Sequence, residues 1–147
     1  MTELQPLSAS HILEYTYKRS VGPVLGRFFT GLRDGRIEGV KTRAGRVLCP
    51  PMEHDPDTGE ATSDQWVEVG PGGVVKSWTW IAEPRAQHPL RKPFAFALIQ
   101  LDGADTALLH AVDADPESMA TGMRVRARFA EERHGAIQDI ACFELES

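Results

Sequence analysis

The chain has 147 residues, and its 21 acidic and 16 basic side chains give a formal net charge of -5 at pH 7. Its length corresponds to about one domain, and without any long run of basic residues it is a poor match for a nucleic-acid backbone. No apolar run reaches the ~18 residues that span a bilayer, and the first residues lack the basic-then-apolar layout of a secretory signal. We therefore expect a cytoplasmic protein with neither nucleic acid nor membrane as partner.

Residues 1–20 mix polar and apolar types without a sustained period. Such a segment becomes ordered when something docks on it. Tyr15 and Tyr17 are the apolar anchors with which this arm would hold a surface.

A helix is expected from Pro23, which suits a first-turn position, to Asp34-Gly35, where glycine suits the helix end. Its apolar residues recur at three- and four-residue spacing: Val24, Leu25, Phe28, Phe29 and Leu32. Most such helices pack on their own domain, and the alternative is a helix that docks on a partner. With the arm, it supplies the candidate partner interface: Tyr15, Tyr17, Leu25, Phe28, Phe29 and Leu32.

Residues 36–51 form two short alternating runs around Ala44-Gly45, which predicts a hairpin. Residues 52–64 are acidic and turn-forming, so we expect a surface loop.

Two strands are predicted on either side of a loop that holds Pro84, Pro89 and Pro93. Residues 73–81 and 94–101 alternate with a period of two. The loop carries four basic residues that are the candidates for a binding site: Arg85, His88, Arg91 and Lys92. The alternative for these four is a solvated loop without a ligand.

Three more strands are expected, at residues 107–112, 123–130 and 136–145. Five strands with one longer interruption before the fourth are typical of a small closed OB-fold barrel. Arg124, Arg126 and Arg128 share one strand face, where we expect them to be solvated and paired with Glu131 or Glu132. A single-stranded nucleic-acid surface using these arginines with Trp78 and Trp80 is a minor alternative.

Chemistry-bearing residues are sparse. The chain lacks the hydrolase, nucleotide-loop and dinucleotide motifs, and His110 alternates with apolar residues as a packed strand histidine does. Cys49 and Cys142 are expected to be buried and reduced. A metal site from Cys49, His54, Asp55 and Asp57 is disfavoured because the spacing matches no zinc pattern.

The chain resembles the DUF35 family, acyl-CoA-associated proteins with a zinc ribbon followed by an OB-fold. The resemblance rests on Gly45, Pro50-Pro51 and Gly59, and on the stretches WVEVGPGGVVKSWTWI and PFAFALIQLDG. The family's two Cys-x-x-Cys pairs fall here on Lys41, Ala44, Asp55 and Thr58. These side chains do not form a tetrahedral zinc site, so we expect no metal and no cofactor.

The resemblance implies a mainly β protein with three parts: an arm and helix (1–35), a degenerate, metal-free, rubredoxin-like ribbon (36–64) and a five-stranded OB-fold (65–147). It also implies a non-catalytic accessory subunit of a thiolase-like or lipid-transfer-type enzyme, a retro-aldolase or acyltransferase, acting on acyl-CoA in a hetero-oligomer. The acyl group, whether steroid, aromatic, polyketide or fatty, is left open. A free-standing acyl-CoA binding module is the alternative. In either case, the candidates for binding the phosphates of acyl-CoA are the loop residues Arg85, His88, Arg91 and Lys92.

Overall fold

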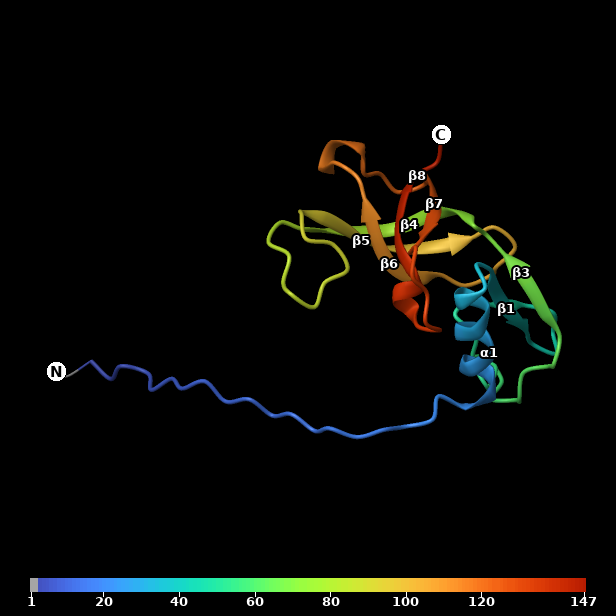
Figure 1. The fold of residues 1–147 in the computed structure, drawn as a ribbon, viewed down its shortest axis with the longest axis horizontal. Helices are drawn as coiled ribbons and strands as arrows, with labels where there is room; N and C mark the ends of the chain where they lie inside the picture. Colours follow the sequence, from blue (N-terminus) through green and yellow to red (C-terminus); the bar gives the residue numbers. More distant parts are fainter. Residues whose placement is uncertain (1–2) are drawn as a thin grey trace.

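The computed structural model describes residues 3–147, and Met1 and Thr2 of the predicted arm lie outside them. One helix, α1 (Gly22–Arg33), precedes a three-stranded sheet and a closed barrel (Figure 1). The sheet has the order β2 (Val47–Leu48), β1 (Ile37–Lys41), β3 (Trp66–Val69). The barrel has the order β4-β5-β6-β8-β7, with these bounds: β4 Gly72–Ile81, β5 Phe94–Leu101, β6 Leu108–Asp113, β7 Arg124–Phe129 and β8 Ile140–Leu145. The predicted fold class, a mainly β chain with an N-terminal helix and a five-stranded OB-fold barrel, is confirmed.

The barrel closes where β4 pairs with two strands at once. Gly73 lies opposite Leu101 of β5 and Val125 of β7. A Cβ atom at Gly73 would lie 2.8 Å from the carbonyl oxygen of Gln100, so closure at this point requires glycine. The circuit is completed by antiparallel pairing of β7 with β8 and parallel pairing of β8 with β6.

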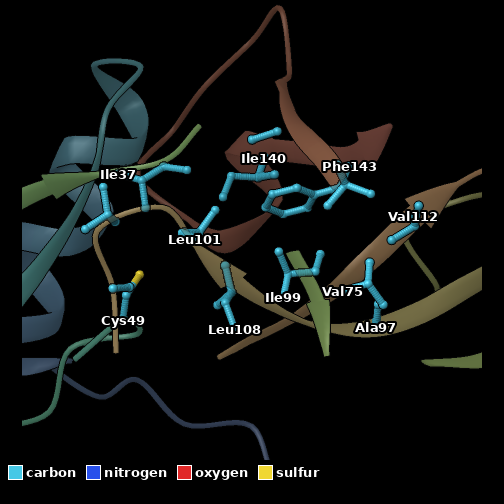
Figure 2. Packing of buried hydrophobic residues seen from close by; sticks show 14 of the residues in the cluster. Ile37, Cys49, Val75, Ala97, Ile99, Leu101, Leu108, Val112, Ile140 and Phe143 are labelled. Carbon is cyan, nitrogen blue, oxygen red and sulfur yellow. The ribbon is translucent and has the colours of Figure 1, made fainter. Parts of the chain in front are cut away.

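One apolar core runs from the three-stranded sheet into the barrel. Strand alternation turns Ala97, Ile99 and Val112 inward, and Phe143 fills the space between them (Figure 2). Ile37 and Cys49 belong to the same cluster and lie beside Leu101 and Leu108 in that view. The sheet and the barrel therefore bury their apolar faces against each other.

The helix packs on this core. Phe28 and Leu32 are at most 1% exposed, and both belong to the main cluster. On its outer flank Arg27 forms an ion pair with Glu38 of β1, 3.1 Å from Nη2 to Oε2, and its guanidinium lies 4.7 Å from the centre of the Trp66 ring on β3. These contacts fix α1 to the three-stranded sheet.

Two elements differ in detail from the prediction. The sequence places Trp66–Val69 in the OB-fold range, and in the structure this strand pairs with β1, so the three-stranded sheet draws residues from both sides of the expected boundary at residue 64. The last strand begins at Ile140 instead of Ala136, because Ile137–Asp139 form a 3-10 turn, η2. The Asp139 carboxylate organises that turn by accepting backbone N–H bonds from His134, Gly135 and Ala136 at 2.7–3.2 Å.

The predicted hairpin around Ala44-Gly45 is present, with Gly45 at φ +91° and Lys41 opposite Val47. Residues 3–20 are extended and fully exposed, and they run away from the folded body (Figure 1). Within residues 3–147, no helix has the length and apolarity that crossing a membrane would require.

Candidate ligand and partner surfaces

The loop between β4 and β5, residues 82–93, lies on the outer face of the barrel, away from α1 (Figure 1). Its central residue, His88, packs edge-on against Phe94 and Phe96, with ring centres 5.6 and 5.7 Å apart. Leu90 packs against a second small cluster formed by Phe94, Ala111 and Cys142. The loop therefore has an apolar anchor of its own outside the barrel interior.

Hydrogen bonds hold the loop in shape. The backbone N–H of Arg85 donates to His88 Nδ1 at 3.0 Å, and the His88 N–H donates back to the Arg85 carbonyl at 3.0 Å. Arg91 donates to the Ala86 carbonyl at 2.5 Å. Lys92 forms an ion pair with Asp113 of β6 at 2.9 Å, and this hydrogen bond holds the pKa of Lys92 above its ordinary value. The loop is preformed, with prolines at three positions limiting its freedom.

The four predicted acyl-CoA contacts share this loop but do not converge on one point. His88 lines a cavity of about 490 Å³, whereas Lys92 lines a separate hollow of about 300 Å³ beside Asp113. Arg85 and Arg91 are exposed on the same loop and line neither cavity. Each arginine therefore presents its charge to solvent near, and not inside, a cavity.

The larger cavity was missed in the sequence. It is formed by the loop, β6, η2 and the start of β8, and these are its lining residues: Gln87, His88, Pro89, Leu90, Phe96, Leu109, His110, Ile137, Gln138, Ile140 and Ala141. The sequence feature that could have indicated this cavity is Leu109, a leucine at an outward-facing position of ALLHAV. In the structure its side chain is 59% exposed. Alternation marks it as outward, but only the tertiary structure shows the loop beside it.

His110 is a structural residue of the barrel. It is buried, its Nδ1 accepts the Ala111 N–H at 2.8 Å, and its ring packs on Phe143. Burial lowers the pKa of His110, so the ring is neutral at pH 7. This agrees with the expectation of a packed strand histidine.

The arginines of β7 face outward as expected, but with other partners than predicted. Arg124 binds Asp102 at 2.6 Å and Glu146 at 3.0 Å, and Arg128 binds Glu144 at 2.9 Å. Glu131 and Glu132 lie beyond the strand end, whereas β8 runs alongside β7 and supplies nearer carboxylates. Two of the three arginines are therefore neutralised locally. Trp78 and Trp80 are half-buried against the barrel core.

The four positions that the DUF35 resemblance aligns with zinc ligands hold one strand-end residue and three loop or turn residues. Asp55 is buried, and its carboxylate accepts the Asp57 N–H at 2.8 Å. Thr58 accepts the Glu60 N–H at 3.2 Å, while Lys41 ends β1 and Ala44 lies in the hairpin turn. This donor set does not fit zinc.

The two cysteines are free and buried. Burial raises the pKa of the Cys49 thiol to about 12, so it stays protonated as a packing residue.

The predicted partner interface divides into buried and accessible residues. Tyr15 and Tyr17 are 80% and 75% exposed, and Leu25 and Phe29 are half-buried on α1. Phe28 and Leu32 were also predicted to meet a partner, but they face the chain's own core. The structure therefore corrects the prediction for these two residues, because the apolar face of α1 packs on β1 and the barrel core of the same chain.

An OB-fold barrel with a helix and a small three-stranded sheet defines the class of this protein. Comparison with known proteins agrees. The family described as the C-terminal OB-fold domain of ChsH2 matches residues 66–130. A DUF35 domain-containing scaffold protein of Pyrococcus furiosus is 30% identical over 90 residues, which are 61% of this chain and 65% of that protein, just under two thirds of its length.

Two solved structures share the fold. A DUF35-family protein of unknown function from Sulfolobus solfataricus has a TM-score of 0.59 and 25% identity, covering 73% of this chain and 77% of the other. The Ltp2-ChsH2(DUF35) aldolase has a TM-score of 0.61 and 20% identity, covering 87% of this chain and 98% of the matched one. Together these comparisons support a DUF35 OB-fold family member.

Proposed function

We propose that this chain is a non-catalytic, cytoplasmic accessory subunit of a lipid-transfer-type or thiolase-like enzyme that acts on acyl-CoA. The P. furiosus relative is described as a scaffold protein, and the fold is shared with a chain of the Ltp2-ChsH2(DUF35) aldolase. In this proposal the partner supplies the catalytic groups, and the present chain supplies docking surface and substrate access.

The observation that carries the proposal is the exposed apolar arm. Within residues 3–20, large apolar side chains are at least 72% exposed: Leu4, Leu7, Ile12, Leu13, Tyr15 and Tyr17. Leaving so many apolar groups in water is unfavourable, and an arm of this kind is stabilised when a partner covers it.

The arm leads into a further apolar surface at the start of α1. Val21 and Met52 are 49% and 47% exposed. A hollow of about 390 Å³ lies between them, with these lining residues: Arg19, Val21, Val24, Leu25, Pro51, Met52, Glu53 and His54. We call the arm together with this hollow the arm–helix surface. Its continuity from Tyr15 to Met52 fits one extended partner contact.

Co-expression with a lipid-transfer-type or thiolase-like enzyme encoded beside this chain tests the proposal. We expect the two proteins to co-elute in size-exclusion chromatography and the enzyme to lose activity without this chain. Replacing Tyr15 and Tyr17 by Ser should weaken co-elution more than replacing Leu4 and Leu7 by Ser, because the tyrosines lie closer along the chain to the hollow that begins at Arg19. A monodisperse monomer that never co-elutes and leaves the enzyme rate unchanged would refute the proposal.

The loop supports the acyl-CoA part of the proposal. Arg91 and Lys92 offer positive charge for CoA phosphates, and their replacement by Ala should weaken acyl-CoA affinity by ~1–3 kcal/mol. Arg43→Ala, an exposed arginine in the distant β1–β2 hairpin, is the matched control. If the complex assembles with the Arg91 and Lys92 variant and its acyl-CoA affinity is unchanged, the loop is not part of the binding site.

A free-standing acyl-CoA binding module is the second candidate, and the 490 Å³ cavity is the observation that favours it. Such a module would retain CoA esters when purified alone. An accessory subunit would change the kinetics of its partner.

A further inference from the structure

The cavity beneath the β4–β5 loop has the size of a small-molecule site. Its volume of about 490 Å³ falls within the range of roughly 300–1,000 Å³ that is usual for ligand pockets. Apolar side chains from three separate parts of the fold form its walls: Leu90 and Phe96, Leu109, and Ile137 with Ile140.

The outer barrel face here is apolar where a solvated strand is normally polar. Leu98 of β5 and Leu109 of β6 lie directly opposite each other and are 41% and 59% exposed. The neighbouring Phe96 is covered on one side by His88. Water in contact with this face is unfavourable, so an apolar ligand that displaces it gains free energy.

The polar groups of the cavity can bind a ligand that is a hydrogen-bond acceptor or an anion. Among residues 3–147, the lining of the cavity holds no carboxylate, and its polar side chains are the amides of Gln87 and Gln138 and the imidazoles of His88 and the buried His110. His88 Nδ1 accepts the Arg85 N–H, so the neutral ring carries its proton on Nε2 and acts there as a donor. Arg85, three residues away, adds an exposed guanidinium to the same loop.

The cavity also adjoins the helix. Ile137 and Gln138 line both this cavity and a second hollow that contains Val21, Phe29 and Thr30. An enzyme docked on the arm and α1 would therefore border the cavity across η2.

We propose that this cavity binds the apolar body of a bulky acyl group, with its thioester or carboxylate end at the donors of the β4–β5 loop. The choice of an acyl ligand rests on the proposed function, whereas the existence of an apolar, anion-tolerant site rests on the geometry of this chain. The site seats the acyl group and takes no part in bond making.

Fluorescence titration of the full chain with 9-anthracenecarboxylate, a ring carboxylate, tests the site without any partner enzyme. We expect saturable binding at one site, weaker binding of the uncharged 9-anthracenemethanol, and no competition by acetate. Arg85→Ala should reduce the preference for the carboxylate over the alcohol.

Leu109→Glu, which places a carboxylate at the rim, should lower affinity for the ring carboxylate by about tenfold or more. Leu145→Glu is the matched control, because Leu145 is a comparably exposed leucine at the far end of β8 and does not line the cavity. Ala141→Trp, which fills the cavity, should give the same loss as Leu109→Glu. Chemical-shift mapping on the unmodified chain should locate the probe at Phe96 and Ile140, which keeps the test valid if a variant fails to fold.

Absence of saturable binding, equal losses in Leu109→Glu and Leu145→Glu, or shifts confined to the arm–helix surface would each overturn the inference. The proposed function fails separately. If the chain binds the probe but forms no complex with an enzyme, the cavity site stands and the accessory role is refuted. If the chain forms the complex but does not bind the probe, the accessory role stands and the cavity site is refuted.

Discussion

The five-stranded barrel and the three-stranded sheet are stabilised in different ways. In the barrel every strand has two neighbours, and Val75, Ile99 and Phe143 are fully buried inside it. In the sheet, β2 has only two residues, and its backbone bonds reach across to the barrel: Val47 N–H donates to Asp105 and Cys49 N–H to Thr106, both at 2.8 Å. A sheet too small for its own core can thus be held by the barrel beside it.

Truncation at the centre of the barrel should produce the largest effect. Phe143→Ala removes a fully buried ring and should lower the free energy of unfolding by about 3–5 kcal/mol. Denaturant unfolding measures this loss. Leu145→Ala on the same strand, at a side chain 48% exposed, should change it by less than about 0.5 kcal/mol. Equal losses would mean that the barrel interior is not the source of stability.

We call the two hydrogen bonds between Cys49 and Thr106 the Thr106 tether. Removing them should loosen the three-stranded sheet and leave the barrel intact. The Thr106 hydroxyl accepts the Cys49 N–H and donates to the Cys49 carbonyl at 3.0 Å. Thr106→Val leaves both groups without a partner, at a cost of about 1–3 kcal/mol. Hydrogen exchange should speed up in β1 and β2 while β5 keeps its protection, and Thr121→Val in an exposed turn is the control. Already in the unmodified chain, residues 37–64 should exchange faster than β5.

Acid should act on the attachment of α1 to the sheet. The Arg27 hydrogen bond is the main cause that holds the pKa of Glu38 below its ordinary value of 4.5, against an opposing effect of burial. A lowered folded-state pKa stabilises the fold above pH 4.5, and this stabilisation is lost as the pH falls through the folded value. Glu38→Gln should therefore flatten the acid side of the stability profile measured by chemical denaturation. An unchanged acid profile in this variant would show that Glu38 is not responsible.

Metal removal should have the smallest effect. We expect elemental analysis to find no stoichiometric zinc, and chelator dialysis to leave the melting temperature unchanged, because Lys41, Ala44, Asp55 and Thr58 do not form a zinc site. About one zinc per chain after dialysis would contradict this. A variant with Cys at all four positions should bind zinc and show slower hydrogen exchange in the three-stranded sheet. The metal would then stabilise the sheet in addition to the Thr106 tether.

The sequence determined most of the secondary structure. The helix, the Ala44-Gly45 hairpin and the strand at residues 94–101 follow from local periodicity and from turn residues, which act within a few positions of each other. The alternation of β7 likewise set which side of the strand its arginines occupy. The DUF35 resemblance was visible in short motifs and is confirmed by the comparisons.

Only the tertiary structure decided which surfaces are free. Phe28 and Phe29 are neighbours with the same chemistry, yet one is buried and the other half-buried, because β1 and the barrel cover only one side of α1. The pairing of Trp66–Val69 with β1, the Thr106 tether and the cavity beside Leu109 all join residues far apart in the chain. Their positions depend on how the barrel closes and where its loops return, and no local pattern encodes that.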